Sequence, residues 1–329
     1  MSYPKFKACA AHVSPVFLNA KATADKACAL IAEAARNGAK LIAFPESYIP
    51  GFPLWAGVQA PVNNHEHFKR LVAESIMVNG PEMQQLRDAA REHAIVVSMG
   101  FSEASPASVG CVWNSNVVIG ADGAILNHHR KLMPTFYEKL IWASGDGAGL
   151  RVSETPIGKI GMLICGENSN PLARYTMIAQ GEQVHISSYP PVWPTRPSNQ
   201  PGRYDLAGAI RIRAGAHSFE GKVFNVVSSA FLDKSNLDEL TSLDRSAREI
   251  LEQSPQAVSM VTAPSGDVVS DTLCDSEGLL YQEIDLAQCV EPKQFHDVAG
   301  YYNRFDVFDL NVNLKRLSPV SFTDGDTAE

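Results

Sequence analysis

The feature that most constrains the fold is the alternation of short apolar runs with segments of helical periodicity. An apolar run over 6–13 predicts a β-strand, and Asn19 predicts the N-cap of a helix that ends at Gly38. A second apolar run, 40–44, predicts the next strand. Because this β-α-β order recurs in the second half of the chain, we expect a layered α/β fold.

Two hairpins are expected between these halves. The Asp-Gly pair at 122–123 is the typical connection of a tight β-hairpin. It joins 113–120 to 124–131, and a second hairpin is predicted to join 150–155 to 159–165. The two β-α-β halves are therefore separated by a pair of hairpins.

The remaining elements follow from the same patterns. Asn170 and Pro171 are suited to the N-cap and the first position of a helix. The other expected elements are, in chain order, a helix from Pro81 to about His93, strands over 94–101 and 184–190, a helix over 204–221, a strand over 222–231, a charged helix over 233–252, and strands over 257–264, 268–273 and 279–286.

No linker or internal repeat divides the chain. The sequence has no Pro/Ser-rich segment, and 329 residues with 45% hydrophobic content are enough for one large core. We therefore expect a single domain over 1–329, with a short C-terminal tail from about 316.

Charge and hydropathy exclude several classes of partner. The formal net charge is −8 and the chain has no basic run, which argues against nucleic acid because phosphate contacts need clustered Lys and Arg. No apolar segment approaches the ~20 residues that span a bilayer, so we expect no membrane partner. The first residues lack the apolar core of a secretory signal.

The six cysteines are scattered singly and include no Cys-x-x-Cys pair. This pattern predicts neither a disulfide framework nor a zinc site. It favours a reducing compartment, the cytoplasm, with most of the cysteines packed as small hydrophobic residues.

Three reactive side chains lie at or near the ends of predicted strands. Glu46 stands in the segment "LIAFPES" after the strand 40–44, Lys131 ends "ILNHHRK" and Cys165 ends "GMLIC". Taken alone, each has an ordinary interpretation: Glu46 as a solvated loop residue, Lys131 as a surface charge and Cys165 as a core residue. In α/β sheets, however, sites gather beyond the carboxyl ends of strands, so the three can meet in one pocket.

Together these three residue types form a chemically consistent set. A thiol with a pKa of about 8.5 is mostly protonated at neutral pH and needs a base or a nearby cation to react. A carboxylate can take its proton, and an ammonium can stabilise negative charge on the attacked group. The set therefore predicts a cysteine nucleophile, a glutamate base and a lysine stabiliser.

Three longer blocks contain these residues: "FPESYIPGFPLW", "HHRKLMPTFYEKLIWASGDG" and "GMLICGENSNPLARYTMIAQGEQVHISSYP". In this order they resemble the nitrilase superfamily of carbon–nitrogen hydrolases, and within it the nitrilase branch. The segment "AGYYNRFDVFDLNVN" is similar to the closing block of that branch. The resemblance spans about residues 5 to 315.

The resemblance implies a fold and a set of roles. The fold is a four-layer αββα sandwich of the carbon–nitrogen hydrolase type, whose subunits pair into a homodimer or a higher homo-oligomer. Cys165 is the nucleophile, Glu46 the general base and Lys131 the stabiliser of the tetrahedral species. Glu138 is a second carboxylate that helps position Lys131 and the substrate. No metal and no organic cofactor is implied.

The implied reaction is hydrolysis of a small organic nitrile to the carboxylic acid and ammonia through a cysteine thioimidate and thioester. An amidase or carbamoyl hydrolase of the same superfamily would use the same residues on an amide. A non-catalytic interaction protein that keeps the scaffold is a third hypothesis, which the presence of all four polar residues disfavours.

One departure from the family pattern concerns the pocket. Nitrilases of this family usually have Trp directly after the nucleophile, where this chain has Gly166, so we expect a reshaped pocket and an altered substrate range. Tyr48, Gly166 and Tyr189 are the predicted pocket residues. Glu167 is expected to act structurally near the helix start, and His185, within a predicted strand, to serve in packing rather than as a partner of the cysteine.

Overall fold

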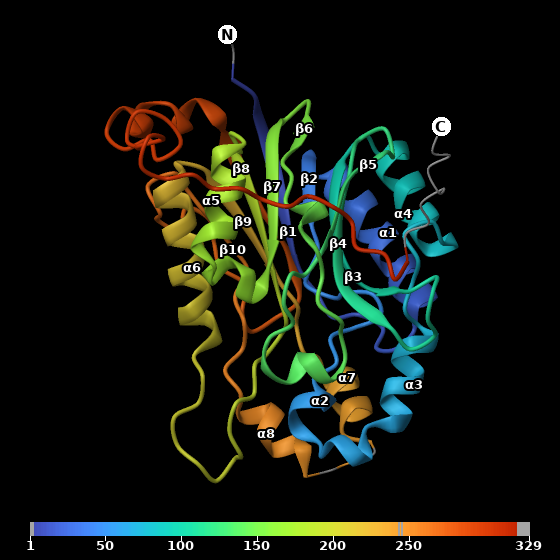
Figure 1. Ribbon diagram of the computed structural model, residues 1–329. Helices are drawn as coiled ribbons and strands as arrows, with labels where there is room; N and C mark the ends of the chain where they lie inside the picture. Colours follow the sequence, from blue (N-terminus) through green and yellow to red (C-terminus); the bar gives the residue numbers. More distant parts are fainter. Residues whose placement is uncertain (1–2, 243, 245, 321–329) are drawn as a thin grey trace, which may run out of the picture.

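The computed structural model describes residues 3–242, 244 and 246–320, and it contains two mixed β-sheets (Figure 1). The first sheet has the strand order β11-β1-β2-β3-β4-β5 and the second the order β10-β9-β8-β7-β6. The strands are β1 (Lys5–His12), β2 (Ala39–Ala43), β3 (Val96–Ala104), β4 (Val112–Ile119), β5 (Ile125–Arg130), β6 (Ser153–Thr155), β7 (Gly158–Ile164), β8 (Val184–Tyr189), β9 (Phe224–Ser229), β10 (Met260–Thr262) and β11 (Gly278–Asp285).

Helices cover the outer faces of the two sheets. In Figure 1, α1 and α4 lie outside the first sheet, and α5 and α6 lie outside the second. The α-helices are α1 (Ala20–Arg36), α2 (Trp55–Val58), α3 (His65–Ala73), α4 (Pro81–Glu92), α5 (Pro171–Ala179), α6 (Leu206–Gly221), α7 (Lys234–Leu240) and α8 (Ala247–Gln253). The predicted four-layer αββα sandwich is confirmed.

Alternation along the strands builds one core between the sheets and a separate outer core on each sheet. In β2, Leu41 and Ala43 belong to the core between the sheets, whereas Ile42 faces the outer core under α1 and α4. In β7, Ile164 lies in the inter-sheet core and Leu163 packs under α5. Successive side chains of a strand point to opposite faces, so β2 and β7 contribute to a core on both sides.

Local capping residues begin the helices where the sequence predicts them. The side chain of Asn19 accepts the backbone N–H of Ala22, and α1 starts at the next residue, Ala20. The side chain of Asn170 accepts the N–H of Leu172, with Pro171 as the first residue of α5. Both predicted helix starts are confirmed. They could be predicted because each cap depends only on neighbouring residues.

Two predicted elements are wrong. The charged helix expected over 233–252 is interrupted between α7 and α8, where the Asp244 side chain accepts the N–H of Ser246 and favours a turn instead. The strand expected over 268–273 forms only isolated bridges, because Ser270 Oγ accepts the N–H of Val261 and interrupts the ladder.

A C-terminal arm, residues 298–317, crosses the outside of the sandwich (red in Figure 1). It contacts α5 through Asn303 and Tyr175, and the edge of the first sheet through Arg316, which donates to the carbonyl of His128 at 2.7 Å. The tail expected from about 316 lies partly, from 321 on, outside the described residues. Among the helices of the described chain, none has the length and apolar character needed to span a membrane.

Candidate active site

Cys165 lies at a sharp change of chain direction. Strand β7 ends at Ile164, the 3₁₀ helix η4 (Cys165–Ser169) follows at once, and Asn170 then caps α5. The backbone φ of Cys165 is 48°, in the left-handed region that L-residues rarely adopt. The residue is 6% exposed and belongs to the inter-sheet core.

Three further predicted residues meet Cys165, two from the ends of other strands and one from a 3₁₀ helix. Glu46 follows β2 and Lys131 follows β5, and Glu138 lies in the 3₁₀ helix η2 (Phe136–Leu140). Lys131 Nζ donates to Glu46 Oε1 at 2.6 Å and to Glu138 Oε2 at 2.7 Å. One oxygen of each carboxylate and the sulfur of Cys165 lie within 4.8 Å of one another.

Lys131 is held as an ammonium between the two carboxylates. Burial alone would lower its pKa, but the charges of Glu138 and Glu46 outweigh burial and raise it. Carboxylates and a thiolate are also metal-ligand types. In this cluster the Lys131 ammonium occupies the position between the carboxylates that a cation would take.

The Cys165 thiol is protonated at rest. Burial raises its pKa well above the usual value, the charge of Glu46 adds to that shift, and the Lys131 ammonium opposes it. Glu46 Oε1 accepts from Lys131, whereas Oε2 is buried with no hydrogen-bond partner among the described residues. This second oxygen is therefore a free acceptor for a proton that leaves a nearby group.

The second carboxylate of the cluster, Glu138, has a raised pKa. Burial, opposed by the Lys131 charge, raises the pKa of the Glu138 carboxyl to about 7. The backbone N–H of Thr135 donates to Glu138 Oε2 at 2.7 Å and fixes the carboxyl at the start of η2.

Asn114 is a member of this cluster that the sequence prediction missed. Its Nδ2 donates to Glu46 Oε1 at 2.7 Å, and its backbone carbonyl accepts the N–H of Lys131 at 2.7 Å. It is 1% exposed on β4. The only available signal was a polar side chain within an apolar strand, which points to a buried hydrogen bond but not to its partner.

Glu167 joins the segments that bear the lysine and the cysteine. Its carboxylate accepts the backbone N–H of Leu132 at 2.6 Å and that of Ile164 at 2.8 Å, together with Nε2 of His129. These contacts match the expected structural role. His185 is fully buried and bonds to Asn168 and Glu182, as expected for a residue that serves in packing.

The structure separates the three predicted pocket residues. Tyr189, at the end of β8, is buried in the same inter-sheet core as Cys165. Tyr48 packs in the outer core instead, because Ser47 has a φ of 47° that turns the chain there, and its hydroxyl donates to the carbonyl of Ser14. Tyr48 therefore lies away from the Cys165 cluster.

Gly166 lines a small cleft beside the nucleophile turn. The cleft has a volume of about 300 Å³, and Met133, Phe136 and Thr135 contribute to its wall. A Cβ added at Gly166 would lie 2.9 Å from Thr135 Oγ1. A larger side chain here would therefore require Thr135 to move.

Aromatic side chains surround the cluster on the inter-sheet side. The rings of Tyr137 and Trp193 stack with centroids 4.5 Å apart, and Phe52 lies edge-on to Trp142 at 5.3 Å. All four belong to the hydrophobic core that contains Cys165. The Tyr137 hydroxyl is buried, with no hydrogen-bond partner in the described part of the chain.

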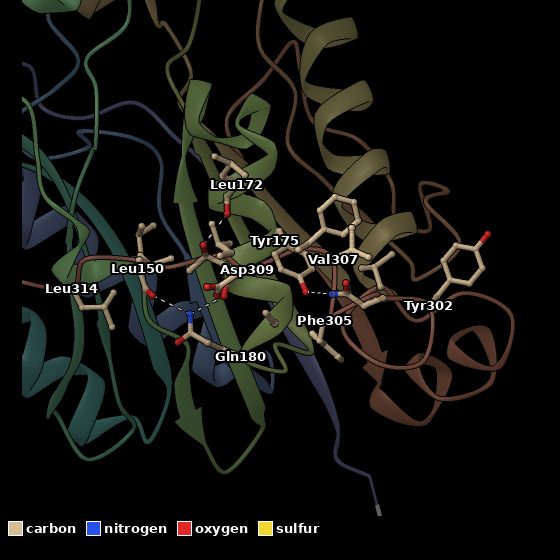
Figure 2. Close-up of a pocket in the computed structure, with 16 residues that line it drawn as sticks. Leu150, Leu172, Tyr175, Gln180, Tyr302, Phe305, Val307, Asp309 and Leu314 are labelled. Carbon is tan, nitrogen blue, oxygen red and sulfur yellow. Dashed lines mark hydrogen bonds between the residues drawn. The ribbon is translucent and has the colours of Figure 1, made fainter.

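A larger cavity, of about 1020 Å³, lies on the outside of the sandwich between α5 and the C-terminal arm. Figure 2 shows Leu172 and Tyr175 of α5 facing Phe305 and Val307 of the arm, with Gln180 donating to the carbonyl of Leu150. Neither Cys165 nor Lys131 lines this cavity. It is therefore separate from the candidate active site.

Comparisons with known proteins agree with the fold and identify the family. The carbon–nitrogen hydrolase family matches residues 7–294. A nitrilase from Paraburkholderia phymatum is 32% identical over 316 residues, 95% of this chain and 88% of that protein. A cyanide hydratase from Gibberella zeae is 34% identical over 98% of this chain and 91% of that protein. A solved carbon–nitrogen hydrolase from Helicobacter pylori shares the fold, with a TM-score of 0.69 and 20% identity over 92% of this chain and 97% of that one. The chain belongs to the carbon–nitrogen hydrolase family, in its nitrilase branch.

Proposed function

We propose that this enzyme hydrolyses a small organic nitrile to the carboxylic acid and ammonia, with Cys165 as the nucleophile. The observation that supports this most is the cluster of a protonated thiol, a Glu46 carboxylate oxygen that has no hydrogen-bond partner among the described residues, and a buried Lys131 ammonium. A neutral thiol needs a base at the moment of attack, and Glu46, one oxygen of which lies within 4.8 Å of Cys165 Sγ, is the base that the cluster offers.

The reaction begins when Cys165 Sγ bonds to the nitrile carbon while Glu46 takes the thiol proton. That proton passes to the nitrile nitrogen and gives a thioimidate. Water, deprotonated by Glu46, adds to the same carbon, and the nitrogen leaves as ammonia to give a thioester. A second water releases the acid and restores the thiol. Lys131 stabilises the charge that develops in each tetrahedral species, and Glu138 holds Lys131 in place.

A second outcome is release of the amide instead of the acid. If the carbon–sulfur bond of the tetrahedral species breaks before ammonia leaves, the product is an amide, and one similar protein is named a cyanide hydratase. Gly166 follows Cys165 directly and lines the small cleft with Thr135, and we infer that its lack of a side chain affects how the intermediate lies. An amidase working on amides by the same residues is the remaining alternative.

The test is turnover of a panel of nitriles and the matching amides, with ammonia, acid and amide measured together. We expect nitriles to be consumed and Cys165→Ala to abolish turnover, with little left in Cys165→Ser because an alkoxide is harder to form than a thiolate. Cys28→Ala, which changes a half-buried cysteine on α1, is the control and should retain full activity. Turnover of amides alone would overturn the nitrilase proposal, and an active Cys165→Ala variant would overturn the nucleophile.

We also propose that two copies pair through α5 and α6 into a homodimer or a higher homo-oligomer. Ile212 and Phe219 of α6 are 74% and 53% exposed and, seven residues apart, share one face of the helix. Leu172 of α5 and Phe305 of the C-terminal arm add exposed apolar side chains near the outer cavity. Exposed apolar surface of this kind is typical of an interface.

Domain organisation and compartment are part of the same proposal. The two sheets share one core, which supports a single domain over 1–329. All six cysteines are free of disulfides within the described chain, which is compatible with the cytoplasm.

A further inference from the structure

A buried polar network lies behind Cys165, on the face of the second sheet that α6 covers. It includes Asn168 in η4, Glu182 before β8, His185 in β8 and His217 in α6, each at most 2% exposed, and Ser187 Oγ of β8 also donates to Asn168 Oδ1 at 3.1 Å. His185 Nε2 lies 2.9 Å from Asn168 Oδ1, and His185 Nδ1 lies 2.9 Å from Glu182 Oε2. Glu182 Oε1 bonds in turn to His217 Nε2. The mechanism proposed above uses none of these residues.

Asn168 connects this network to the nucleophile. Its Nδ2 donates to the backbone carbonyl of Cys165 at 3.1 Å and to that of Leu163 at 3.2 Å. These carbonyls flank the position where the chain takes its left-handed φ of 48°. Such a conformation persists only where the surrounding structure fixes it, and Asn168 supplies two of the fixing contacts.

The two carbonyls determine how the whole network is protonated. A backbone carbonyl only accepts hydrogen bonds, so the NH₂ of Asn168 faces Cys165 and Leu163 and its oxygen faces His185. His185 must therefore carry a proton on Nε2 and donate it to Asn168. With Nε2 protonated, the contact between His185 Nδ1 and Glu182 Oε2 needs a second proton between those two atoms, and the charge of the Glu182 carboxylate opposes the burial that lowers the pKa of His185.

Glu182 has a fixed place because Gly161 leaves room for it. A Cβ at Gly161 of β7 would collide with Glu182 Oε2, so a side chain there would displace the carboxylate. Gly161 is paired with His185 across the β7–β8 ladder, so Gly161, Glu182 and His185 lie next to one another.

We propose that Asn168 is a positioning residue for Cys165, and that His185 holds Asn168 in its working orientation by donating from Nε2. The inference rests on the proposed role of Cys165 as nucleophile. It assigns His185 an indirect part in the reaction: the imidazole orients the amide that fixes the turn, and the turn aims the sulfur at the substrate.

Two substitutions of His185 separate this role from ordinary core stability. In His185→Gln the side-chain NH₂ can take the place of Nε2 and still donate to Asn168, but the contact with Glu182 is lost. In His185→Asn the shorter side chain can take the place of Nδ1 and keep the Glu182 contact, but it cannot reach Asn168. Each variant serves as the matched control for the other.

We expect kcat to depend on whether the contact with Asn168 is kept, and the melting temperature to depend on whether the contact with Glu182 is kept. His185→Gln should retain kcat within about threefold of wild type, whereas His185→Asn should lose about 10- to 100-fold with little change in KM, the scale of a small misplacement of a reacting group. His185→Asn should nevertheless melt at the higher temperature of the two. If kcat follows the melting temperature, or if neither variant changes kcat, the proposal is wrong.

A second readout does not depend on the substrate. The rate at which iodoacetamide alkylates Cys165, followed by intact mass, should fall in His185→Asn and remain near wild type in His185→Gln. If the wild-type enzyme turns over no nitrile, the proposed function fails while this comparison still tests the positioning role. Should both variants be insoluble, ¹⁵N NMR of the wild-type histidines decides, because a His185 Nε2 without a proton would overturn the proposal.

Discussion

At the scale of single residues, Glu138 sets the pH range in which Lys131 keeps both of its carboxylate partners. The pKa of the Glu138 carboxyl is raised to about 7 by burial, so the group is protonated, and its ion pair with Lys131 weakened, as the pH falls below that value. We expect kcat/KM of the wild-type enzyme to rise with pH through an apparent pKa near 7. In Glu138→Gln this rise should vanish and the plateau should be lower by about 10²- to 10³-fold. A rise near pH 7 that persists in the variant would assign it to another group.

Gly166 is the residue at which we expect a substitution to change the substrate range. Gly166→Trp alone must displace Thr135 Oγ1, which would lie 2.9 Å from the new Cβ, so we expect it to lower kcat/KM for all nitriles. Adding Thr135→Ala removes the obstructing atom and should restore turnover with a changed order of preference or a changed amide fraction, whereas Thr135→Ala alone keeps the wild-type order. Product ratios measured over the nitrile panel test this. An unchanged ratio in the double variant would show that position 166 does not face the substrate.

At the scale of secondary-structure elements, Glu167 holds the end of β5 to the end of β7. Burial alone would raise its pKa, but His129 and the N–H groups of Leu132 and Ile164 outweigh burial and hold the pKa below its usual value of 4.5. Its stabilising contribution is therefore present above about pH 4.5 and is lost as the pH falls through the lowered pKa.

We expect Glu167→Gln to lower the free energy of unfolding by about 3 kcal/mol at pH 7, because a buried charged hydrogen-bond network loses one acceptor. The difference from wild type should shrink below pH 4. Glu220→Gln removes a half-exposed ion pair with Arg174 and should cost less than about 1 kcal/mol. Urea unfolding at both pH values measures these differences. If the two variants lose the same free energy of unfolding, Glu167 does not hold the ends of β5 and β7 together.

The same scale explains what the sequence could predict. The starts of α1 and α5 were predictable because Asn19 and Asn170 cap them locally. The gathering of Glu46, Lys131 and Cys165 was predictable because strand ends share one edge of a layered fold. The interruption at Asp244 was not, because a side-chain turn competes with helix formation there on nearly equal terms.

Contacts between distant segments limited the prediction of the site. Asn114 contacts Glu46 from 68 residues away, and nothing local in β4 indicates that partner. Tyr48 stands two residues from Glu46, yet the left-handed φ at Ser47 directs it into the other core. Glu138 was predicted only from the blocks that resemble the family, because its contact with Lys131 depends on the fold of η2.

At the scale of the whole molecule, the C-terminal arm links α5, outside the second sheet, to the edge of the first sheet. It bonds to Tyr175 of α5 at one end, while at the other Arg316 pairs with Asp146 and the carbonyl of His128. Between these points Phe305 and Phe308 remain 67% and 72% exposed. A segment fixed at both ends that presents exposed aromatic rings has the character of a surface completed by another subunit.

The proposed pairing through α5 and α6 predicts that a charge on the exposed face of α6 separates the subunits. Ile212→Glu places a carboxylate where an apolar contact is expected, and the cost of burying it should shift the enzyme from twice the 35.7 kDa chain mass, or a multiple of it, toward the monomer. Val109→Glu changes an apolar residue that is 97% exposed on the loop between β3 and β4 and should leave the mass unchanged. Light scattering after gel filtration measures both variants. If Ile212→Glu keeps the wild-type mass, the subunits pair through another face, and if the wild-type enzyme is itself a monomer, the exposed residues of α6 require a different partner.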